Sequence, residues 1–451
     1  MIMNGKLILA VKILLVFGAG ACAADWPQWR GTNRDGAWEE SGVVERFAGP
    51  ELAIVWRAKI GNGYSGPTVA EGRVYVTDRV SRPRQIERVH CFDARTGANI
   101  WSYPYESNYR KVGYPNGPRA AVTVDSGRAY SLGTMGHLFC FDAATGEVAW
   151  SKDLDAEYDC RIPTWGIAAA PLAEKELVIV HVGGREDASL IAFDKVTGRE
   201  RWRALGDNAS YSAPVIIEQA GRRVLVCWTG ERVVGLAPLT GRLLWGHPFK
   251  QDRMIMNIAT PVYRNGYLFV SSFFDGSLLL KVSEDRPAVE KVWRREGANE
   301  RDTDSLHCCI STPLIQDKYI YGIDSYGELR CLELTTGDRV WESLDAVPKA
   351  RWANIHMVVN GDKVWMFNER GELIISRLSP DGFEQISRAK LIEPTKGQLN
   401  QRGGVCWAHP AFAGGRIYAR NDEELVCADL SAKGTAELKR QLEIDPAREK
   451  K

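Results

Sequence analysis

His307, Cys308 and Cys309 form a run of three side chains of chemically reactive types. A disulfide between two adjacent cysteines closes a strained eight-membered ring, so such a bond is seldom formed without a reason. The alternative is that Cys308 and Cys309 are small, half-buried side chains of an inner strand. Both interpretations stay open, and the second makes no demand on function.

Two histidines occupy matching places in the sequence. His356 precedes the turn Asn360-Gly361 by four residues, and His409 precedes Ala413-Gly414 by the same interval. Two imidazoles brought together could hold a ligand or a metal ion, but the sequence offers no third or fourth ligand. A hydrogen-bonded pair inside the core fits the pattern better. We therefore predict neither a metal site nor a catalytic residue here.

A repeat with a period of about 43 to 52 residues positions these side chains. Its copies share a turn of the type Asp-x-x-Thr-Gly and a tryptophan four residues after the glycine. The three clearest copies are Phe92–Gly97 with Trp101, Phe141–Gly146 with Trp150, and Phe193–Gly198 with Trp202. Degenerate or partial copies keep the register at Trp56, Trp245, Trp293 and Trp341.

Each part of the motif has a local cause. The Asp at the end of a strand can accept hydrogen bonds from the amides of the turn, and the glycine supplies the positive φ that the turn needs. The tryptophan then lies on the following outer strand, where a large flat ring fills the gap between neighbouring blades. Short β-rich runs precede each turn, so each repeat supplies four strands and no helix.

The outer strands number eight when a weak one near Ile386, which lacks a tryptophan, is included. Leu52–Trp56 has no blade before it, and Leu425–Asp429 has no outer strand after it. Pairing these two segments removes both exposed edges. The sequence therefore predicts an all-β fold, an eight-bladed β-propeller of four-stranded antiparallel blades, with the ring closed by pairing of the N-terminal strand with the C-terminal blade.

Aromatic and basic residues gather in the loops that precede the inner strands: Tyr64, Arg119, Trp165, Tyr211, Arg351, Trp352 and Trp407. His307, Cys308 and Cys309 occupy such a loop before blade six, and His356 and His409 lie in blades seven and eight. A shared position brings these residues to one end of the ring, where propellers usually bind ligands. Large rings that plug the mouth of the channel are the alternative.

Cysteines are frequent, and nine remain once Cys22 is set aside. An odd number leaves at least one thiol free or paired outside the chain. Four of them, Cys91, Cys140, Cys331 and Cys427, stand directly before the turn motif in four different repeats. Repeat symmetry places them in separate blades, so we interpret them as small buried apolar side chains.

The repeated Asp-x-x-Thr-Gly-x-x-x-Trp pattern resembles the pyrroloquinoline-quinone (PQQ) repeat over nearly all of the chain. The segment Asp25–Gly31 with Asn33–Gly36 resembles the start of secreted PQQ-like propellers of unassigned role. More distantly, the resemblance extends to the propeller lipoprotein of the outer-membrane β-barrel assembly machine and to quinoprotein alcohol dehydrogenases.

The dehydrogenase resemblance implies one candidate cofactor site. Those enzymes have two adjacent cysteines beside the quinone, which makes Cys308 and Cys309 candidates to contact PQQ, with calcium as its companion ion. Their calcium-holding carboxylates and their catalytic base find no match in this sequence, and their cysteine pair comes early in the chain. No Cys-x-x-Cys-His motif is present, which excludes a fused c-type haem.

The first residues have the pattern of an export signal. An apolar run that includes Ile13–Ala21 follows Lys6 and Lys12, and Ala21 and Ala23 suit cleavage before Ala24. A lipid anchor at Cys22 is the minor alternative, because Ala19–Cys22 loosely resembles a lipoprotein box. We expect a signal peptide at 1–23, an N-terminal extension at 24–47, the propeller at 48–432 and a charged tail at 433–451.

Composition narrows the choice of partners. With 58 basic and 57 acidic residues the net charge is +1, which gives no reason to expect nucleic acid. No segment after the signal is apolar enough to cross a membrane. We expect a bacterial periplasmic or extracellular monomer, a non-enzymatic scaffold that binds a protein, peptide or glycan and needs no cofactor. The alternatives are a PQQ-dependent alcohol or sugar dehydrogenase and an outer-membrane assembly lipoprotein.

Overall fold

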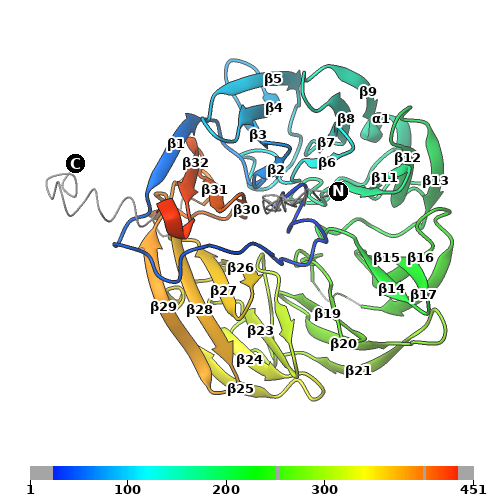
Figure 1. Cartoon of the computed structure of the whole chain (residues 1–451). Helices are drawn as coiled ribbons and strands as arrows, with labels where there is room; N and C mark the ends of the chain where they lie inside the picture. Colours follow the sequence, from blue (N-terminus) through cyan, green and yellow to red (C-terminus); the bar gives the residue numbers. More distant parts are fainter. Residues whose placement is uncertain (1–23, 250, 252, 400–402, 435–451) are drawn as a thin grey trace, which may run out of the picture.

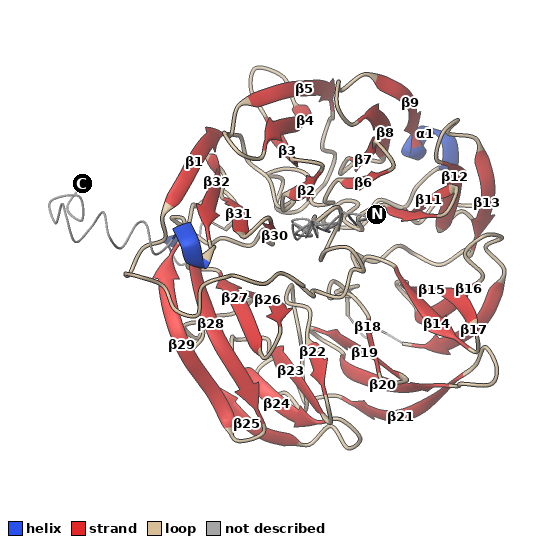
Figure 2. Cartoon of the chain, viewed as in Figure 1, coloured by secondary structure: helices blue, strands red, loops and turns tan. Residues whose placement is uncertain are grey.

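The computed structural model describes residues 24–249, 251, 253–399 and 403–434. These residues form eight four-stranded sheets arranged as the blades of a ring (Figure 1). Strands make up almost all of the regular structure, and the short helix α1 (Leu154–Tyr158) lies at the rim (Figure 2). The predicted all-β eight-bladed propeller is confirmed. Among the described residues, no helix is long and apolar enough to cross a membrane.

Strands follow one another outward in blades one to seven. Blades one to four comprise β2 (Thr68–Ala70), β3 (Arg73–Val80), β4 (Ile86–Asp93) and β5 (Asn99–Glu106); β6 (Thr123–Asp125), β7 (Arg128–Leu132), β8 (His137–Asp142) and β9 (Val148–Asp153); β10 (Leu172–Glu174), β11 (Leu177–His181), β12 (Leu190–Asp194) and β13 (Glu200–Ala204); β14 (Val215–Gln219), β15 (Arg222–Trp228), β16 (Arg232–Leu236) and β17 (Leu243–Pro248).

Blades five to seven repeat this order, and blade eight combines strands from both ends of the chain. They comprise β18 (Val262–Arg264), β19 (Tyr267–Ser272), β20 (Gly276–Val282) and β21 (Val289–Arg295); β22 (Leu314–Gln316), β23 (Tyr319–Ile323), β24 (Leu329–Glu333) and β25 (Arg339–Ser343); β26 (Ile355–Asn360), β27 (Lys363–Asn368), β28 (Glu372–Ser379) and β29 (Gly382–Lys390); β30 (Ala411–Ala413), β31 (Arg416–Arg420), β32 (Glu424–Asp429) and β1 (Ile54–Lys59).

Ring closure follows the predicted pairing. Strand β1 adds to β32 in antiparallel orientation, with Ile54 opposite Ala428 and Lys59 opposite Glu424. The register shifts between Ile54 and Trp56, so the strand carries a bulge at this point. Both chain ends therefore contribute to one sheet, and neither leaves an open edge in the ring.

Tryptophans fill the seams between blades as the motif predicts. The indole of Trp101 in blade one packs over Gly146 in the turn of blade two, and its N–H donates to the carbonyl of Ala143 at 3.1 Å. Trp150 repeats the arrangement over Gly198. A Cβ at Gly146 would lie 2.5 Å from the Trp101 ring. The turn glycine is thus required by its positive φ and also by the indole beside it.

The aspartate of the motif stabilises the same turns by accepting hydrogen bonds within them. The Asp93 carboxylate accepts hydrogen bonds from the backbone N–H groups of Arg95 and Thr96 and from the Thr96 hydroxyl. These bonds, above all that from the Thr96 side chain, lower the pKa of Asp93.

The four cysteines that stand directly before the turns are fully buried and form no disulfide bond, as expected for small apolar side chains.

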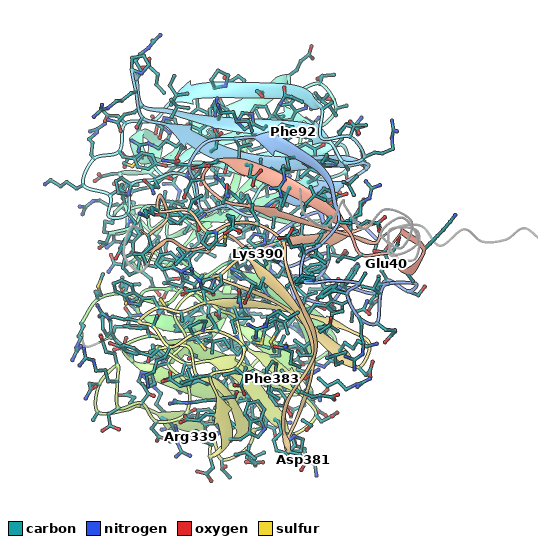
Figure 3. The ribbon with its side chains drawn as sticks, turned by 90° about the vertical axis from the view of Figure 1, so that its left-hand side faces the viewer. Glu40, Phe92, Arg339, Asp381, Phe383 and Lys390 are labelled. Carbon is teal, nitrogen blue, oxygen red and sulfur yellow. The ribbon has the colours of Figure 1, made fainter. Side chains whose placement is uncertain are left out.

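The N-terminal segment crosses one face of the ring (Figure 1). Trp26 pairs with Val69 of β2, the Pro27 carbonyl accepts from Val124 N–H, and Trp38 N–H donates to Val359 of β26. These contacts involve the innermost strands β2, β6 and β26, so the segment runs along the inner edges of separate blades. In the side view, Glu40 of this segment lies at one face of the molecule (Figure 3).

A matched pair of glycine variants tests the seam packing. Gly146 and Gly127 both have φ above +70°, but a Cβ at Gly127 would meet nothing within 4 Å. We expect Gly127→Ala to lower the free energy of unfolding by about 1–2 kcal/mol for the left-handed backbone alone. Gly146→Ala should lose about 1–3 kcal/mol more, because its methyl group overpacks the Trp101 indole. Urea unfolding measures both, and equal losses would contradict the packing role.

Candidate functional site

A cavity of about 350 Å³ lies on the ring axis. Its walls come from the loops that precede the innermost strands, and its floor includes Trp29 of the N-terminal segment. The lining is aromatic and aliphatic with a few polar groups, and consists of Trp29, Tyr64, Tyr114, Arg119, Trp165, Ala168, Ala170, Tyr211, Ala213, Met254, Met256, Ile258, Phe274, Cys309, Ile310, Arg351, Trp352, His356, Trp407 and His409.

Most of the residues singled out in the sequence meet in this cavity. Its lining includes all seven aromatic and basic loop residues predicted to converge, both histidines and one of the two adjacent cysteines: Tyr64, Arg119, Trp165, Tyr211, Arg351, Trp352, Trp407, His356, His409 and Cys309. They come from several blades and lie close to the start of the innermost strand. Five of them stand four residues before that strand: Tyr64, Arg119, Tyr211, Arg351 and Trp407. Their proximity follows from that shared place, and their role in binding stays a prediction.

His307 and Cys308 do not line the cavity. Cys308 is fully buried in the apolar core between blades five and six, while Cys309 packs with Met256 and Phe273 toward the axis. The His307 ring is also fully buried, and it accepts a hydrogen bond from the N–H of Gly297 at 3.1 Å. Both cysteines are free thiols in the structure. Neighbouring side chains in extended backbone point to opposite sides, so only one of two adjacent cysteines can face the axis.

Tyr114 stands among three tryptophans at the mouth of the cavity. Its ring centroid lies 6.5 Å from that of Trp165, 6.3 Å from that of Trp352 and 6.4 Å from that of Trp407. These tryptophans precede blades three, seven and eight, so Tyr114 contacts loops from different parts of the ring. Trp165 also packs on Tyr211, with centroids 5.0 Å apart. The result is a set of aromatic faces that surround one small space.

Two arginines bring positive charge to the same lining. The Arg119 guanidinium lies over the Tyr64 ring, 4.8 Å from its centroid, and donates to the carbonyls of Gly113 and Tyr114 at 3.0 and 2.6 Å. Burial lowers the pKa of Arg119. Arg351 lies 4.4 Å over the Trp352 ring, but its charge is paired with Glu300. The two guanidinium groups therefore differ in how far their charge is compensated.

The floor of the cavity holds both histidines against Trp29. The His409 ring meets the Trp29 ring edge-on, with centroids 4.3 Å apart, and lies 6.1 Å from the His356 ring. The predicted hydrogen bond between the histidines is replaced by bonds to the backbone, since His356 Nε2 donates to the Trp407 carbonyl at 2.8 Å and His409 Nδ1 to the Pro410 carbonyl at 3.2 Å. Burial lowers the pKa of His356 to about 4 and that of His409 to about 3.

Arg34 anchors the floor from below. Its side chain is almost completely buried, and its guanidinium donates to the carbonyls of Ala170, Pro171 and Pro214. These carbonyls belong to the residues that lead into blades three and four. The bonds tie the N-terminal segment to the inner wall of the ring and hold Trp29 at the base of the cavity.

Several lining residues carry no mark in the sequence that would assign them to the site. Trp29 belongs to a segment without the repeat, and Tyr114 lies in an irregular loop with a left-handed φ of 51°. Met254, Met256 and Phe274 also line the cavity. The available signal for Trp29 was the Asp25–Gly36 motif, which the structure shows to be the segment that closes one end of the channel. Nothing periodic marks Tyr114.

The oxygen donors expected around a calcium-bound quinone do not gather here. Among the described lining residues, three tyrosines carry the side-chain oxygens, and none is a carboxylate or a carboxamide. Calcium prefers several oxygen ligands that include carboxylates. In the described part of the chain, no group of three or more His, Cys, Asp or Glu side chains could hold a metal ion. The described donor set therefore does not fit calcium-held PQQ.

The comparisons with known proteins agree with this fold. The family described as "Outer membrane protein assembly factor BamB" matches residues 85–343 and 309–443, which is more than half of the chain. The chain belongs to this family. Its resemblance to PQQ-like propellers is thus confirmed. No curated protein matches the chain in sequence.

Solved structures of this family and its neighbours are similar to the chain at low identity. BamB from Moraxella catarrhalis is 17% identical, covers 84% of this chain and 98% of its own length, and has a TM-score of 0.57. The quinohemoprotein alcohol dehydrogenase of Comamonas testosteroni is 14% identical over 89% of this chain and 80% of its own, with a TM-score of 0.61. The computationally designed protein Ika8 is 11% identical over 84% of this chain and all of its own length, with a TM-score of 0.54. These likenesses show the fold alone.

Acid sensitivity tests the burial of the cavity histidines. The pKa of His356 is lowered from an ordinary value of 6.5 to about 4, so the unfolded chain binds more protons than the native one between these values. Stability is therefore fully present above pH 6.5 and is lost as the pH falls toward 4. By pH 5 we expect this group alone to account for roughly 2 kcal/mol of that loss.

His356→Gln isolates this contribution, because an amide side chain can still donate to the Trp407 carbonyl and does not titrate. Urea unfolding at pH 7.5 and at pH 5 should show a smaller loss of stability in the variant than in the wild-type protein. Identical losses in the two proteins would mean that His356 is not held neutral by burial.

Proposed function

We propose that this protein is an exported, non-enzymatic binding propeller that receives an apolar, aromatic group of a protein or peptide partner in its axial cavity. One observation carries the proposal, the convergence of aromatic side chains from separate blades on a cavity of about 350 Å³. Pockets of about 300–1,000 Å³ that are mainly apolar, with a few placed polar groups, are typical of ligand sites.

A protein or peptide partner suits this lining better than a glycan. Sugars carry many hydroxyl groups, and each one that is buried without a hydrogen bond costs free energy. The lining offers few polar side chains to satisfy them, whereas Trp, Met and Phe surfaces pack well against apolar groups. A partner that inserts one aromatic side chain would bury it on several sides.

The second candidate, a PQQ-dependent dehydrogenase, has one feature in its favour, because Cys309 lines the cavity. Its requirements are otherwise poorly met. Burial raises the pKa of the Cys309 thiol well above its ordinary range, so this thiol stays protonated. Burial also keeps His356 and His409 neutral near pH 7. The described lining supplies neither calcium ligands nor a carboxylate base.

A short peptide tests the binding function. We expect an alanine-based peptide with capped ends and one internal Trp to bind with a micromolar Kd, and the same peptide with Ala in place of Trp to bind at least tenfold more weakly. Trp165→Ala removes an aromatic wall and should weaken binding about tenfold, because aromatic contacts contribute about 0.5–1.5 kcal/mol beyond the buried area.

Ile100→Ala is the control, since Ile100 lies on an outer strand and is 45% exposed. It should leave the Kd unchanged in isothermal titration calorimetry. Equal binding of the Trp and Ala peptides would refute the proposal. The same purified protein should show no dye-linked alcohol oxidation when supplied with PQQ and calcium, and sustained turnover would favour the dehydrogenase instead.

Attachment to a membrane is a separate matter. Cys22 and the segment 1–23 lie outside the described residues. We propose a cleaved signal peptide and release into the periplasm or the medium, with lipidation at Cys22 as the alternative that an assembly lipoprotein would need. Fractionation of cells that express the full chain and its Cys22→Ala variant should place both in the soluble exported fraction. A wild-type protein in the membrane fraction, released by Cys22→Ala, would establish the lipid anchor.

A further inference from the structure

We infer that the ligand of the axial cavity is an aromatic carboxylate, with its ring among the tryptophans of the mouth and its carboxylate on the guanidinium of Arg119. This inference deepens the proposed binding function and rests on it. Two sources share this chemistry, a small aromatic acid and the carboxyl-terminal residue of a polypeptide that ends in an aromatic side chain.

Arg119 is a half-buried cation whose bonded partners are backbone carbonyls. Its two terminal nitrogens donate to the carbonyls of Gly113, Tyr114 and Gly117. A carbonyl oxygen is only a partial negative charge, so these bonds orient the guanidinium without neutralising it. Partial removal of a cation from water costs free energy unless an anion compensates the charge. A ligand carboxylate would supply that compensation.

The nearby acidic side chains are already engaged. Glu87 acts on Arg119 electrostatically, but its carboxylate accepts hydrogen bonds from the hydroxyls of Tyr105 and Tyr109 and from the N–H of Thr134. Glu300 is committed to Arg351, with two contacts of 2.7 Å. Of the two cavity arginines, Arg119 is therefore the one available to a ligand.

The charge of the lining favours an aromatic carboxylate over a quaternary ammonium ligand, although aromatic rings can surround either. Rings such as Trp165, Trp352 and Trp407 could surround a quaternary ammonium group through cation–π contacts. Such a ligand would have to approach the guanidinium of Arg119 in a lining where the described residues include no carboxylate. Like charges at close range cost free energy in a medium of low dielectric constant. The same rings stack equally well on an aromatic ligand, whose carboxylate the arginine attracts.

The geometry matches a ligand with both parts. Arg119 stacks on Tyr64 at one side of the lining, and Tyr114, whose carbonyl the guanidinium binds, leads to the tryptophans. A cavity of about 350 Å³ is near the lower limit of ligand pockets, so it accommodates a bicyclic ring and a short acidic side chain rather than a folded segment.

A pair of nearly isosteric ligands tests the inference. Indole-3-propionic acid and indole-3-propionamide differ in charge and hardly in shape. We expect the wild-type protein to prefer the acid by about 10- to 100-fold in Kd, the range that a charge-assisted hydrogen bond provides. Arg119→Gln keeps amide donors for the loop carbonyls but removes the charge, so it should reduce this preference to less than about threefold.

Arg161→Gln is the matched control. Arg161 also donates to a loop carbonyl, that of Gly206, at 2.7 Å, and it lies outside the cavity lining. It should keep the full preference for the acid. A purely structural role of Arg119 would weaken the acid and the amide together and leave their ratio unchanged, so the ratio separates the two roles even if the variant is less stable.

The outcomes distinguish this inference from the proposed function. If the amide binds as tightly as the acid, the inference is overturned while the binding function stands. If neither ligand binds, and the internal-Trp peptide also fails to bind, both are overturned. Ala-rich peptides with a C-terminal Trp, as free acid and as amide, identify the source. If the peptide acid binds better than the amide and Arg119→Gln abolishes this preference, the ligand is a chain terminus. If the preference for an acid is confined to the free indole acid, the ligand is a small molecule.

Discussion

The contact between an indole and a turn glycine holds neighbouring blades in a fixed relation. Trp56, Trp101, Trp150, Trp202 and Trp293 each lie over a glycine in the turn of the next blade, at Gly97, Gly146, Gly198, Gly241 and Gly337. In each case the indole N–H donates to a backbone carbonyl near that turn, at 2.9 to 3.1 Å. A ring built from one repeated contact places equivalent residues at equivalent distances from the axis, and that regularity positions the site.

The contact between blades seven and eight lacks the tryptophan of the motif. Its outer strand carries Ile386 where other blades have a tryptophan, and the N-terminal segment supplies the missing aromatic surface. Trp38 is buried between Trp365 and Phe412, with centroids 5.4 and 5.0 Å away. The N–H of Phe47 also bonds the Ser387 hydroxyl. The segment therefore completes the core as well as crossing the channel.

Repeat register explains how much the sequence could predict. Because Tyr64, Tyr211 and Trp407 each stand four residues before the innermost strand of their blade, their convergence could be predicted without any knowledge of contacts. The sequence assigns the two adjacent cysteines to the right loop. It does not show which of them faces the axis and which lies in the core between the blades, because neighbouring residues point to opposite sides. The repeat does not predict Tyr114, which lies in an irregular loop and has a left-handed φ. It does not predict Trp29 either, because this residue belongs to a segment without the repeat.

The electrostatics of the channel follow from the same N-terminal segment. Burial lowers the pKa of Arg34 to about 9 and that of Arg30 to about 10, so both stay charged near pH 7 below the cavity floor. The positive charge of Arg30 further lowers the pKa of both His356 and His409, which keeps the floor histidines neutral. A floor backed by guanidinium groups repels metal ions and organic cations. The positive charge of this segment would thus favour the anionic ligand proposed for the cavity, as Arg119 does.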